Sequence, residues 1–235
     1  MNFAPVAFQG QTFWNNLVVN LWQGNYTANS TTWDNLVPGG VQPTSLPSTG
    51  FTKNATGVIM RGGNNSSYFT LPTSVAGSNG SWDTQPNWTI VTYGNITGTT
   101  NQMWWRKQSS GSNGHAALYS NNPICFVRAP GSSNQINTTG NVTGRGSLTA
   151  YSFVYSGVSQ GLWYVNKVSQ ATTNQSSATA NLNAPYDFIW AGNGTTSSWG
   201  SNSALQIQLN RLLIFNKPLN GGELGQVIDF CTQNQ

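Results

Sequence analysis

The chain has 235 residues, of which only 6% are charged, whereas an ordinary soluble domain carries about 25%. Hydrophobic residues make up 37% and aromatic residues 12%, which is enough apolar area to bury a core and excludes a disordered chain. The nine Lys and Arg outnumber the five Asp and Glu, but they are scattered, so no dense basic patch for nucleic acid is visible. No apolar run reaches the roughly 18 residues of a membrane span, and the first ten residues lack the features of an export signal.

Short β-rich runs separated by Gly, Asn, Ser and Pro clusters predict an all-β sandwich or barrel. The expected strands are 13–22, 57–61, 68–71, 88–93, 102–107, 116–119, 124–128, 148–155, 162–166, 188–191 and 205–215. In the last of these, Leu205, Ile207 and Leu209 alternate with polar residues, which predicts one buried face. The long polar gaps 24–51 and 170–184 are expected to be surface excursions.

One helix is expected near the C-terminus. Its apolar stripe at helical spacing is formed by Leu224, Val227, Ile228 and Cys231. Asn220 and Glu223 stand in the relation of an N-cap and its reciprocal partner. We expect this helix to be short and to lie across a sheet edge. Because no linker divides the chain, we expect one domain over residues 1–235, with residues 1–12 as an N-terminal arm.

Four segments carry a recognisable order and spacing. They are 17–22 followed by Thr-Thr-Trp-Asp-Asn-Leu at 31–36, then 88–93, then 161–167, and finally 210–219 followed by Glu223 and Leu224. Together they resemble the laminin-G-like, concanavalin A-like domains of the divergent type found in virus, phage and secreted microbial surface proteins. The resemblance implies an all-β fold: an antiparallel two-sheet jelly-roll sandwich with one short C-terminal helix. Lectins, glycosidases, adhesins and capsid proteins share this fold, so it does not fix the function.

The acidic residues are too few and too scattered to predict an active site. They are Asp34, Asp83, Asp187, Glu223 and Asp229. Glycoside hydrolysis needs two carboxylates about 5–10 Å apart, and no close pair is visible, so we assign no catalytic residue and expect no enzyme activity. Glu223 is interpreted as a helix cap and His115 as a loop histidine. We expect no cofactor and no metal site; calcium held by Asp34, Asp83 or Asp187 with amide and carbonyl oxygens is the weaker alternative.

Tryptophans divide into core and contact candidates. Those inside apolar strands are interpreted as core: Trp14, Trp22, Trp88, Trp163 and Trp190. Trp82 and Trp199 sit among small polar residues, so we expect them to stack on sugar rings or to anchor a protein interface. Trp104 and Trp105 are neighbours on a strand and point to opposite faces, so one of them faces outward; Trp105 is the third contact candidate.

Twelve asparagines begin an N-x-Ser/Thr motif, which is more than composition alone would give. These glycosylation candidates are Asn25, Asn29, Asn54, Asn64, Asn65, Asn79, Asn87, Asn95, Asn137, Asn141, Asn174 and Asn193. The motifs indicate either a glycan coat on an exterior surface or chance triplets in polar loops that are never modified. Cys125 and Cys231 either form a disulfide or stay as two buried thiols, and the sequence does not choose between them.

Low charge, abundant amides, missing catalytic pairs and the resembled fold favour a non-enzymatic structural protein of a virion exterior, as a capsid, decoration or spike component. Such a protein would be glycosylated, reside on the virion surface or outside the cell, contact copies of itself and other virion or surface proteins, and bind host glycans. Neither nucleic acid nor a membrane span is expected. The alternative is a secreted or cell-surface carbohydrate-binding, lectin-like module with Trp82 and Trp199 as sugar platforms.

Overall fold

The structure is a computed structural model. It describes residues 10–44, 46–61, 69–72, 87–96, 105–108, 114–115, 126–128, 135–138, 146–156, 161–174, 188–190 and 206–233. Within these ranges the protein is mostly β, the paired strands are antiparallel, and one α-helix lies near the C-terminus. This confirms the all-β prediction at the level of fold class.

The elements in chain order are the 3₁₀ helix η2 (Thr12–Asn16), β1 (Leu17–Trp22), the 3₁₀ helix η3 (Gln23–Asn25), β2 (Thr52–Asn54), β3 (Gly57–Arg61), β4 (Phe69–Leu71), β5 (Asn87–Ile96), β6 (Trp105–Gln108), β7 (Gly114–His115), β8 (Phe126–Arg128), β9 (Gln135–Thr138), β10 (Thr149–Ser156), β11 (Gly161–Val165), β12 (Val168–Gln170), β13 (Thr172–Asn174), β14 (Phe188–Trp190), β15 (Gln206–Phe215) and α1 (Gly221–Gln233).

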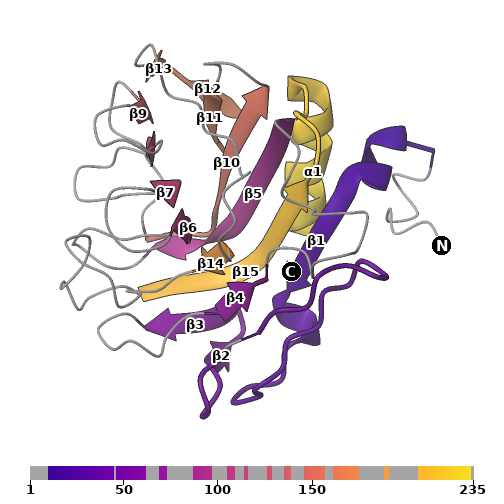
Figure 1. The fold of residues 1–235 in the computed structure, drawn as a ribbon, viewed down its shortest axis with the longest axis vertical. Helices are drawn as coiled ribbons and strands as arrows, with labels where there is room; N and C mark the ends of the chain where they lie inside the picture. Colours follow the sequence, from indigo (N-terminus) through magenta and orange to yellow (C-terminus); the bar gives the residue numbers. More distant parts are fainter. Residues whose placement is uncertain are drawn as a thin grey trace.

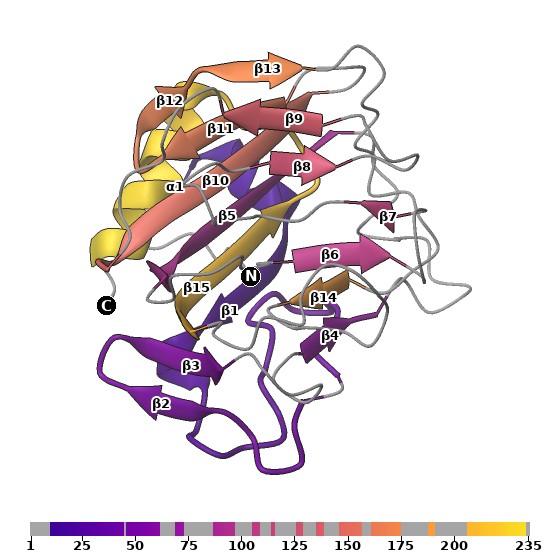
Figure 2. The same cartoon turned by 90° about the vertical axis from the view of Figure 1, so that its left-hand side faces the viewer.

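Three sheets form two β layers, with a helix outside them (Figure 1). The main sheet has eight strands in the order β12-β11-β10-β5-β15-β3-β2, and β1 also pairs with β15. The short strands form a three-stranded sheet, β13-β9-β8, and a four-stranded sheet, β4-β14-β6-β7. Figure 2 shows these short strands in front of the main sheet and α1 behind it. The arrangement is that of an all-β sandwich closed on its back by a helix.

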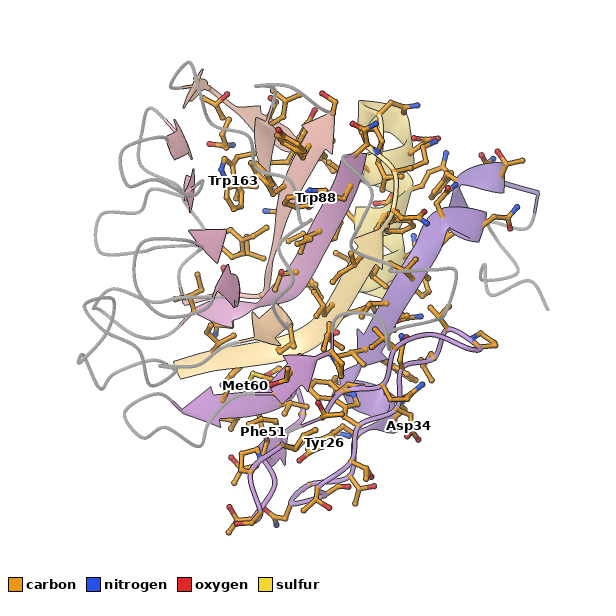
Figure 3. The ribbon with its side chains drawn as sticks, in the orientation of Figure 1. Tyr26, Asp34, Phe51, Met60, Trp88 and Trp163 are labelled. Atoms are coloured by element: carbon orange, nitrogen blue, oxygen red, sulfur yellow. The ribbon has the colours of Figure 1, made fainter. Side chains whose placement is uncertain are left out.

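The first core fills the space between the main sheet and the short strands. Its rings include Trp88, Phe153 and Trp163, whose centroids lie 5.2 Å apart between Trp88 and Phe153 and 4.7 Å apart between Phe153 and Trp163 (Figure 3). Phe69 and Leu71 of β4 are fully buried in the same core. These contacts tie the front strands to the main sheet by apolar burial. They confirm the core interpretation of Trp88 and Trp163.

The second core lies on the opposite face of the main sheet, under η2 and α1. The middle strands contribute Val91 and Tyr93 from β5 and Leu213 from β15, and the helix contributes Leu224 and Val227. The middle strands are therefore buried on both faces, which explains their nearly continuous apolar sequences. The expected helix exists, but the prediction that it crosses a sheet edge was wrong, because its apolar stripe covers the centre of a sheet face that needs burial.

The central strand β15 changes its facing halfway along. Ile207 and Leu209 lie in the first core, as the alternation predicted, but further along the strand it is Leu212 that lies there. The register shift between Leu209 and Arg211 leaves Asn210 as an extra residue against Gly94 and Tyr93 of β5. Such a β-bulge reverses which residues face each side. Arg211 consequently lies on the helix side of the sheet.

The chain enters the sheet later than expected. Residues 13–16 form a 3₁₀ turn instead of the start of a strand. Phe13 and Trp14 are consecutive, yet both pack into the second core, with ring centroids 5.2 Å apart. An extended strand would place neighbouring side chains on opposite faces, so burial of both requires the turn.

Some strands were not predicted. The hairpin between β11 and β12 turns at Asn166 and Lys167, with Asn166 at a φ of 53°, a conformation that asparagine tolerates better than most residues. Val168 of β12 is 64% exposed, so no buried face marked this short strand. β13 lies at the start of the gap 170–184, which was expected to be a surface excursion. The expected strand 116–119 lies outside the described residues.

The polar segment after β1 is held by one buried side chain instead of a strand. Asn35 is 6% exposed. Its Oδ1 accepts hydrogen bonds from the backbone N–H of Asn20 (2.9 Å) and Val37 (3.1 Å). Its Nδ2 donates to the backbone carbonyls of Val18 (3.0 Å) and Val41 (2.9 Å). The amide thus takes the place of a partner strand along the open edge of β1.

Candidate ligand-binding site

The end of β1 meets the bulged part of β15 on the helix side of the main sheet. Trp22, the last residue of β1, is directly opposite Arg211, so both side chains lie on one face. The Trp22 ring packs on exposed Gly24, where a Cβ would stand 2.6 Å from the ring atom Cε2. A side chain at position 24 would therefore require the Trp22 ring to move. Trp22 itself is half-buried.

Arg211 is a buried cation held between aromatic rings. It is only 3% exposed. Its guanidinium carbon lies 4.2 Å from the ring centre of Phe230 and 5.1 Å from that of Trp22. Burial lowers the pKa of Arg211 to about 10, against a smaller opposite influence of Cys231, so the group is charged at neutral pH. We name Trp22, Arg211, Phe230 and Cys231 the Arg211 cluster.

The surroundings of Arg211 compensate its charge only in part. Cation–π contact with a desolvated ring contributes about 2 kcal/mol, and a helix C-terminus, such as the last turn of α1 beside Arg211, contributes up to about 2 kcal/mol more. Removing a charged group from water costs several kcal/mol when no counter-charge is present (about 3–5 for a broken pair). Within the described ranges no carboxylate and no hydrogen-bond acceptor pairs with this guanidinium. The cluster is therefore suited to receiving an anionic group.

Other polar atoms near the end of β1 are buried without a protein partner. They are Nε of Arg211, Nε1 of Trp22, Oε1 of Gln23 and Oδ1 of Asn20. Native proteins pair nearly all such atoms. Asn20 and Trp22 belong to β1, Gln23 begins η3 directly after it, and Arg211 of β15 is opposite Trp22, so the unpaired atoms come from adjoining residues. Together they offer two donors and two acceptors, which is the equipment of a small polar binding site.

Sequence reasoning did not find this cluster. Trp22 was assigned to the core with the other strand tryptophans, yet it is half-buried, whereas Trp14 is 5% exposed and confirmed as core. The available signal was Arg211 itself, a charged residue inside the apolar run that ends at Phe215. The bulge at Asn210 then placed it on the helix side, and no alternation pattern predicts that.

Of the three predicted contact tryptophans, Trp82 and Trp199 lie outside the described residues. Trp105 occupies the position on β6 opposite Trp190 of β14, which in turn is opposite Phe69 of β4. These three positions share one face of the sheet, and Phe69 is fully buried in the first core. The contact role of Trp105 stays a prediction.

The described sequons differ in exposure. Asn29 and Asn54 are exposed, Asn29 in a turn and Asn54 at the β2–β3 hairpin. Asn25 is half-buried and donates from Nδ2 to the carbonyl of Asp34. Asn87 and Asn95 lie in β5 with a buried Oδ1. Asn29 and Asn54 are thus the most accessible of these five. Asn137 and Asn174 are placed on β9 and β13, whereas Asn64, Asn65, Asn79, Asn141 and Asn193 lie outside the described residues.

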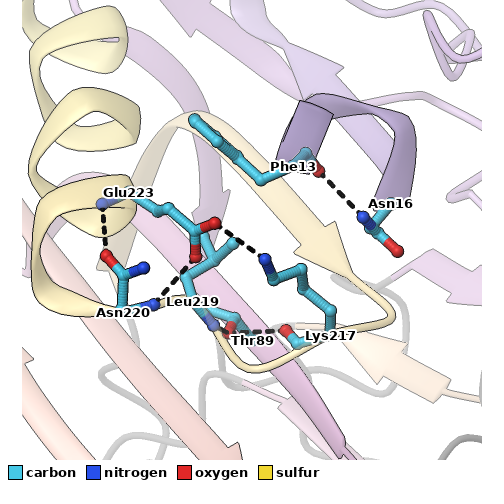
Figure 4. Close-up of polar contacts among 7 residues, drawn as sticks. All are labelled: Phe13, Asn16, Thr89, Lys217, Leu219, Asn220 and Glu223. Atoms are coloured by element: carbon cyan, nitrogen blue, oxygen red, sulfur yellow. Dashed lines mark hydrogen bonds and ion pairs between the residues drawn. The ribbon is translucent and has the colours of Figure 1, made fainter. Parts of the chain in front are cut away.

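The acidic residues stay apart where the structure describes them. Asp34 is exposed on the loop after β1 (Figure 3), and Asp229 pairs with Lys167. Glu223 accepts from the backbone N–H of Asn220 (3.0 Å), and Asn220 Oδ1 accepts from that of Glu223 (2.9 Å), while Lys217 lies 2.7 Å from the Glu223 carboxylate (Figure 4). This reciprocal arrangement confirms Glu223 as a helix cap. Asp83 and Asp187 lie outside the described residues.

In the part of the chain that the structure describes, no group of three or more His, Cys, Asp and Glu side chains is suited to a metal ion. The interpretation of His115 as a loop histidine was wrong, because His115 lies on the short strand β7, paired with Lys107 of β6. No helix in the described part of the chain is long and apolar enough to cross a membrane.

Cys231 is a free thiol with no exposed surface in the second core, and Cys125 lies outside the described residues. Burial raises the pKa of Cys231 to about 12, although the charge of Arg211 acts in the opposite direction. Because thiolates and not thiols react with alkylating reagents, this side chain is doubly protected, by burial and by protonation. Whether it ever pairs with Cys125 stays a prediction.

We therefore expect Cys231 to resist iodoacetamide at pH 8 in the folded protein and to react fully in denaturant. The measurement is intact mass of a Cys125→Ser variant after labelling with and without guanidinium chloride. Fast labelling of the folded variant would contradict the burial of this thiol. Wild-type protein, denatured without reductant, distinguishes the two alternatives left by the sequence, since a Cys125–Cys231 disulfide would leave no thiol to label and two thiols would both react.

Fold and site define an all-β antiparallel sandwich domain with a helix-covered sheet and a buried arginine cluster at one end of the helix. No family model and no curated protein matches the sequence. Several solved structures resemble this chain in fold. Trypanosoma rangeli sialidase in complex with sialic acid superposes with a TM-score of 0.61 at 15% identity over 94% of this chain. The binding domain of Paraclostridial Mosquitocidal Protein 1 superposes with a TM-score of 0.66 at 11% identity over 92% of this chain.

A second toxin gives a similar result. The binding domain of botulinum neurotoxin DC, solved in complex with rat synaptotagmin II, has a TM-score of 0.64 at 9% identity over 92% of this chain. This chain spans 33% of the sialidase and 52% of each toxin domain. At these identities the likeness shows the fold alone. The likeness supports the all-β fold predicted from the sequence, and the finer laminin-G-like or concanavalin A-like assignment stays a prediction.

Proposed function

We propose that this domain is a carbohydrate-binding, lectin-like module that acts by binding and not by catalysis. The observation that carries the proposal is the fold likeness over more than nine-tenths of the chain to the binding domains of two toxins and to a sialidase solved with sialic acid. We further propose that its two β layers have the jelly-roll connectivity of concanavalin A-like domains, and that it acts outside the cell. Its abundant amide and hydroxyl side chains suit hydrogen bonding to sugar hydroxyls.

The expectation of a virion building block receives no support from these likenesses. None of the three structures is described as a capsid, decoration or spike protein. The carbohydrate-binding alternative therefore replaces it as the preferred function. The expected contacts with copies of the chain and with other virion proteins are not part of this proposal.

The test is binding of the purified full chain to a glycan array, with light scattering on the same sample. We expect a monomer that binds at least one saccharide. We expect Trp82→Ala or Trp199→Ala to lower the affinity at least tenfold, because each removes a ring on which a sugar would stack. The comparable stacking of a nucleic-acid base on an aromatic side chain contributes about 1–3 kcal/mol. Leu162→Ala is the control, because this apolar side chain is 42% exposed on β11 and is not among the predicted contact residues. A large symmetric oligomer that binds no glycan would overturn the proposal.

A further inference from the structure

The Arg211 cluster holds a buried guanidinium whose counter-charge the described part of the chain does not supply. Only 3% of the Arg211 surface is exposed. The guanidinium lies between the rings of Phe230 and Trp22, and its Nε has no hydrogen-bond partner. The two carboxylates of α1 have other roles. Asp229 forms an ion pair with Lys167, and Glu223 caps the opposite end of the helix. Arginine presents a planar fork of donors that matches a carboxylate.

We propose that the Arg211 cluster binds the carboxylate of an acidic saccharide. The inference rests on the proposed function, because it names the sugar class. The ligand would reach the guanidinium beside Trp22, the half-buried ring of the cluster, which lies on the exposed backbone of Gly24. Phe230 and Cys231 are 7% and 0% exposed and close the inner side.

The neighbouring polar atoms suit the rest of such a ligand. Nε1 of Trp22 donates, whereas Oε1 of Gln23 and Oδ1 of Asn20 accept, and each is buried without a protein partner. A sugar hydroxyl both donates and accepts. The set therefore matches a carboxylate flanked by hydroxyls better than it matches a fully deprotonated inorganic anion such as sulfate, which offers acceptors alone.

The probe is N-acetylneuraminic acid, with its methyl ester as a neutral twin that differs only at the carboxyl group, and acetate as a carboxylate without a sugar. Binding is followed by NMR titration of the wild-type chain, in which the Arg211 Nε–H resonance reports contact without any substitution. We expect the acid to shift that resonance and to bind at least tenfold more tightly than the ester. Acetate should bind weakly, because it lacks the hydroxyls.

Arg211→Met is expected to abolish the preference for the acid over the ester. Lys167→Met is the control and should keep the preference, because it also removes one positive charge but from an exposed ion pair. Where Arg211→Met fails to fold, Arg211→Lys replaces it, which keeps the charge and loses the bidentate fork. Equal binding of acid and ester, an unshifted Arg211 resonance, or an unchanged preference in Arg211→Met would overturn the inference. Neutral glycans bound on the array with no preference for the acid would leave the carbohydrate-binding function standing and remove this site from it.

Discussion

Asn35→Leu is expected to lower the free energy of unfolding by about 4 kcal/mol or more. The substitution keeps the side-chain volume and removes all of the hydrogen bonds made by a 6% exposed amide. It leaves the N–H groups of Asn20 and Val37 and the carbonyls of Val18 and Val41 without this partner. Each buried polar group left unpaired costs about 1–3 kcal/mol.

The measurement is equilibrium denaturation in urea, followed by tryptophan fluorescence. Asn25→Leu is the control, because it makes the same change at a half-buried amide. Its Nδ2 donates to the carbonyl of Asp34 (2.9 Å), and its Oδ1 accepts a long hydrogen bond (3.4 Å) from Nε1 of Trp33, which keeps the carbonyl of Trp22 as a partner. We expect about 1 kcal/mol there. Equal costs at the two positions would contradict the role of Asn35 as the partner of the open edge of β1.

Gly94→Ala is expected to destabilise the protein by about 3 kcal/mol, at the upper end of the cost of overpacking. Gly94 lies in β5 directly opposite Leu209, beside the bulge of β15. A Cβ at this position would overlap the backbone carbonyl oxygen of Gln208 and stand 3.4 Å from the Leu209 Cα. Both are backbone atoms of the central strand, which cannot move aside without disturbing its pairing with β3 and β5.

The same substitution at Gly225 gives a control with the opposite sign. Gly225 lies inside α1, and no atom stands within 4 Å of the Cβ that alanine would add. Alanine is favoured over glycine in a helix by about 0.5–1 kcal/mol, so Gly225→Ala should stabilise the protein. Thermal and urea denaturation of both variants compare them directly. A neutral Gly94→Ala would show that β5 and β15 approach less closely than the structure has them.

Local patterns were sufficient for much of the fold. The β3 prediction agrees residue for residue with Gly57–Arg61, because a short apolar run between turn residues has few alternatives. The helix α1 was predicted from its stripe and from the cap formed by Asn220 and Glu223, since spacing and capping are local properties. Short strands with little burial, such as β12, left no comparable pattern.

The site was less predictable than the fold. Arg211 was visible as an isolated charge in an apolar strand, but its partners Trp22 and Phe230 come from β1 and α1, which are remote in sequence. The exposed tryptophans proposed from sequence, Trp82 and Trp199, lie outside the described residues and remain predictions. Their proposed role depends on loop geometry, which side-chain alternation does not specify.

The sequence by itself determined the all-β class and the capped C-terminal helix, because each follows from periodicity and capping over neighbouring residues. It predicted one buried face for the strand around Leu205, Ile207 and Leu209, and the structure buries the middle strands on both faces. Only the tertiary structure decided which face the helix covers and where the charge of Arg211 lies. The position of Arg211 depends on the single extra residue at Asn210, which reverses the facing of β15. A bulge is stabilised by contacts between distant strands, so its effect on the position of Arg211 cannot be read from the local sequence.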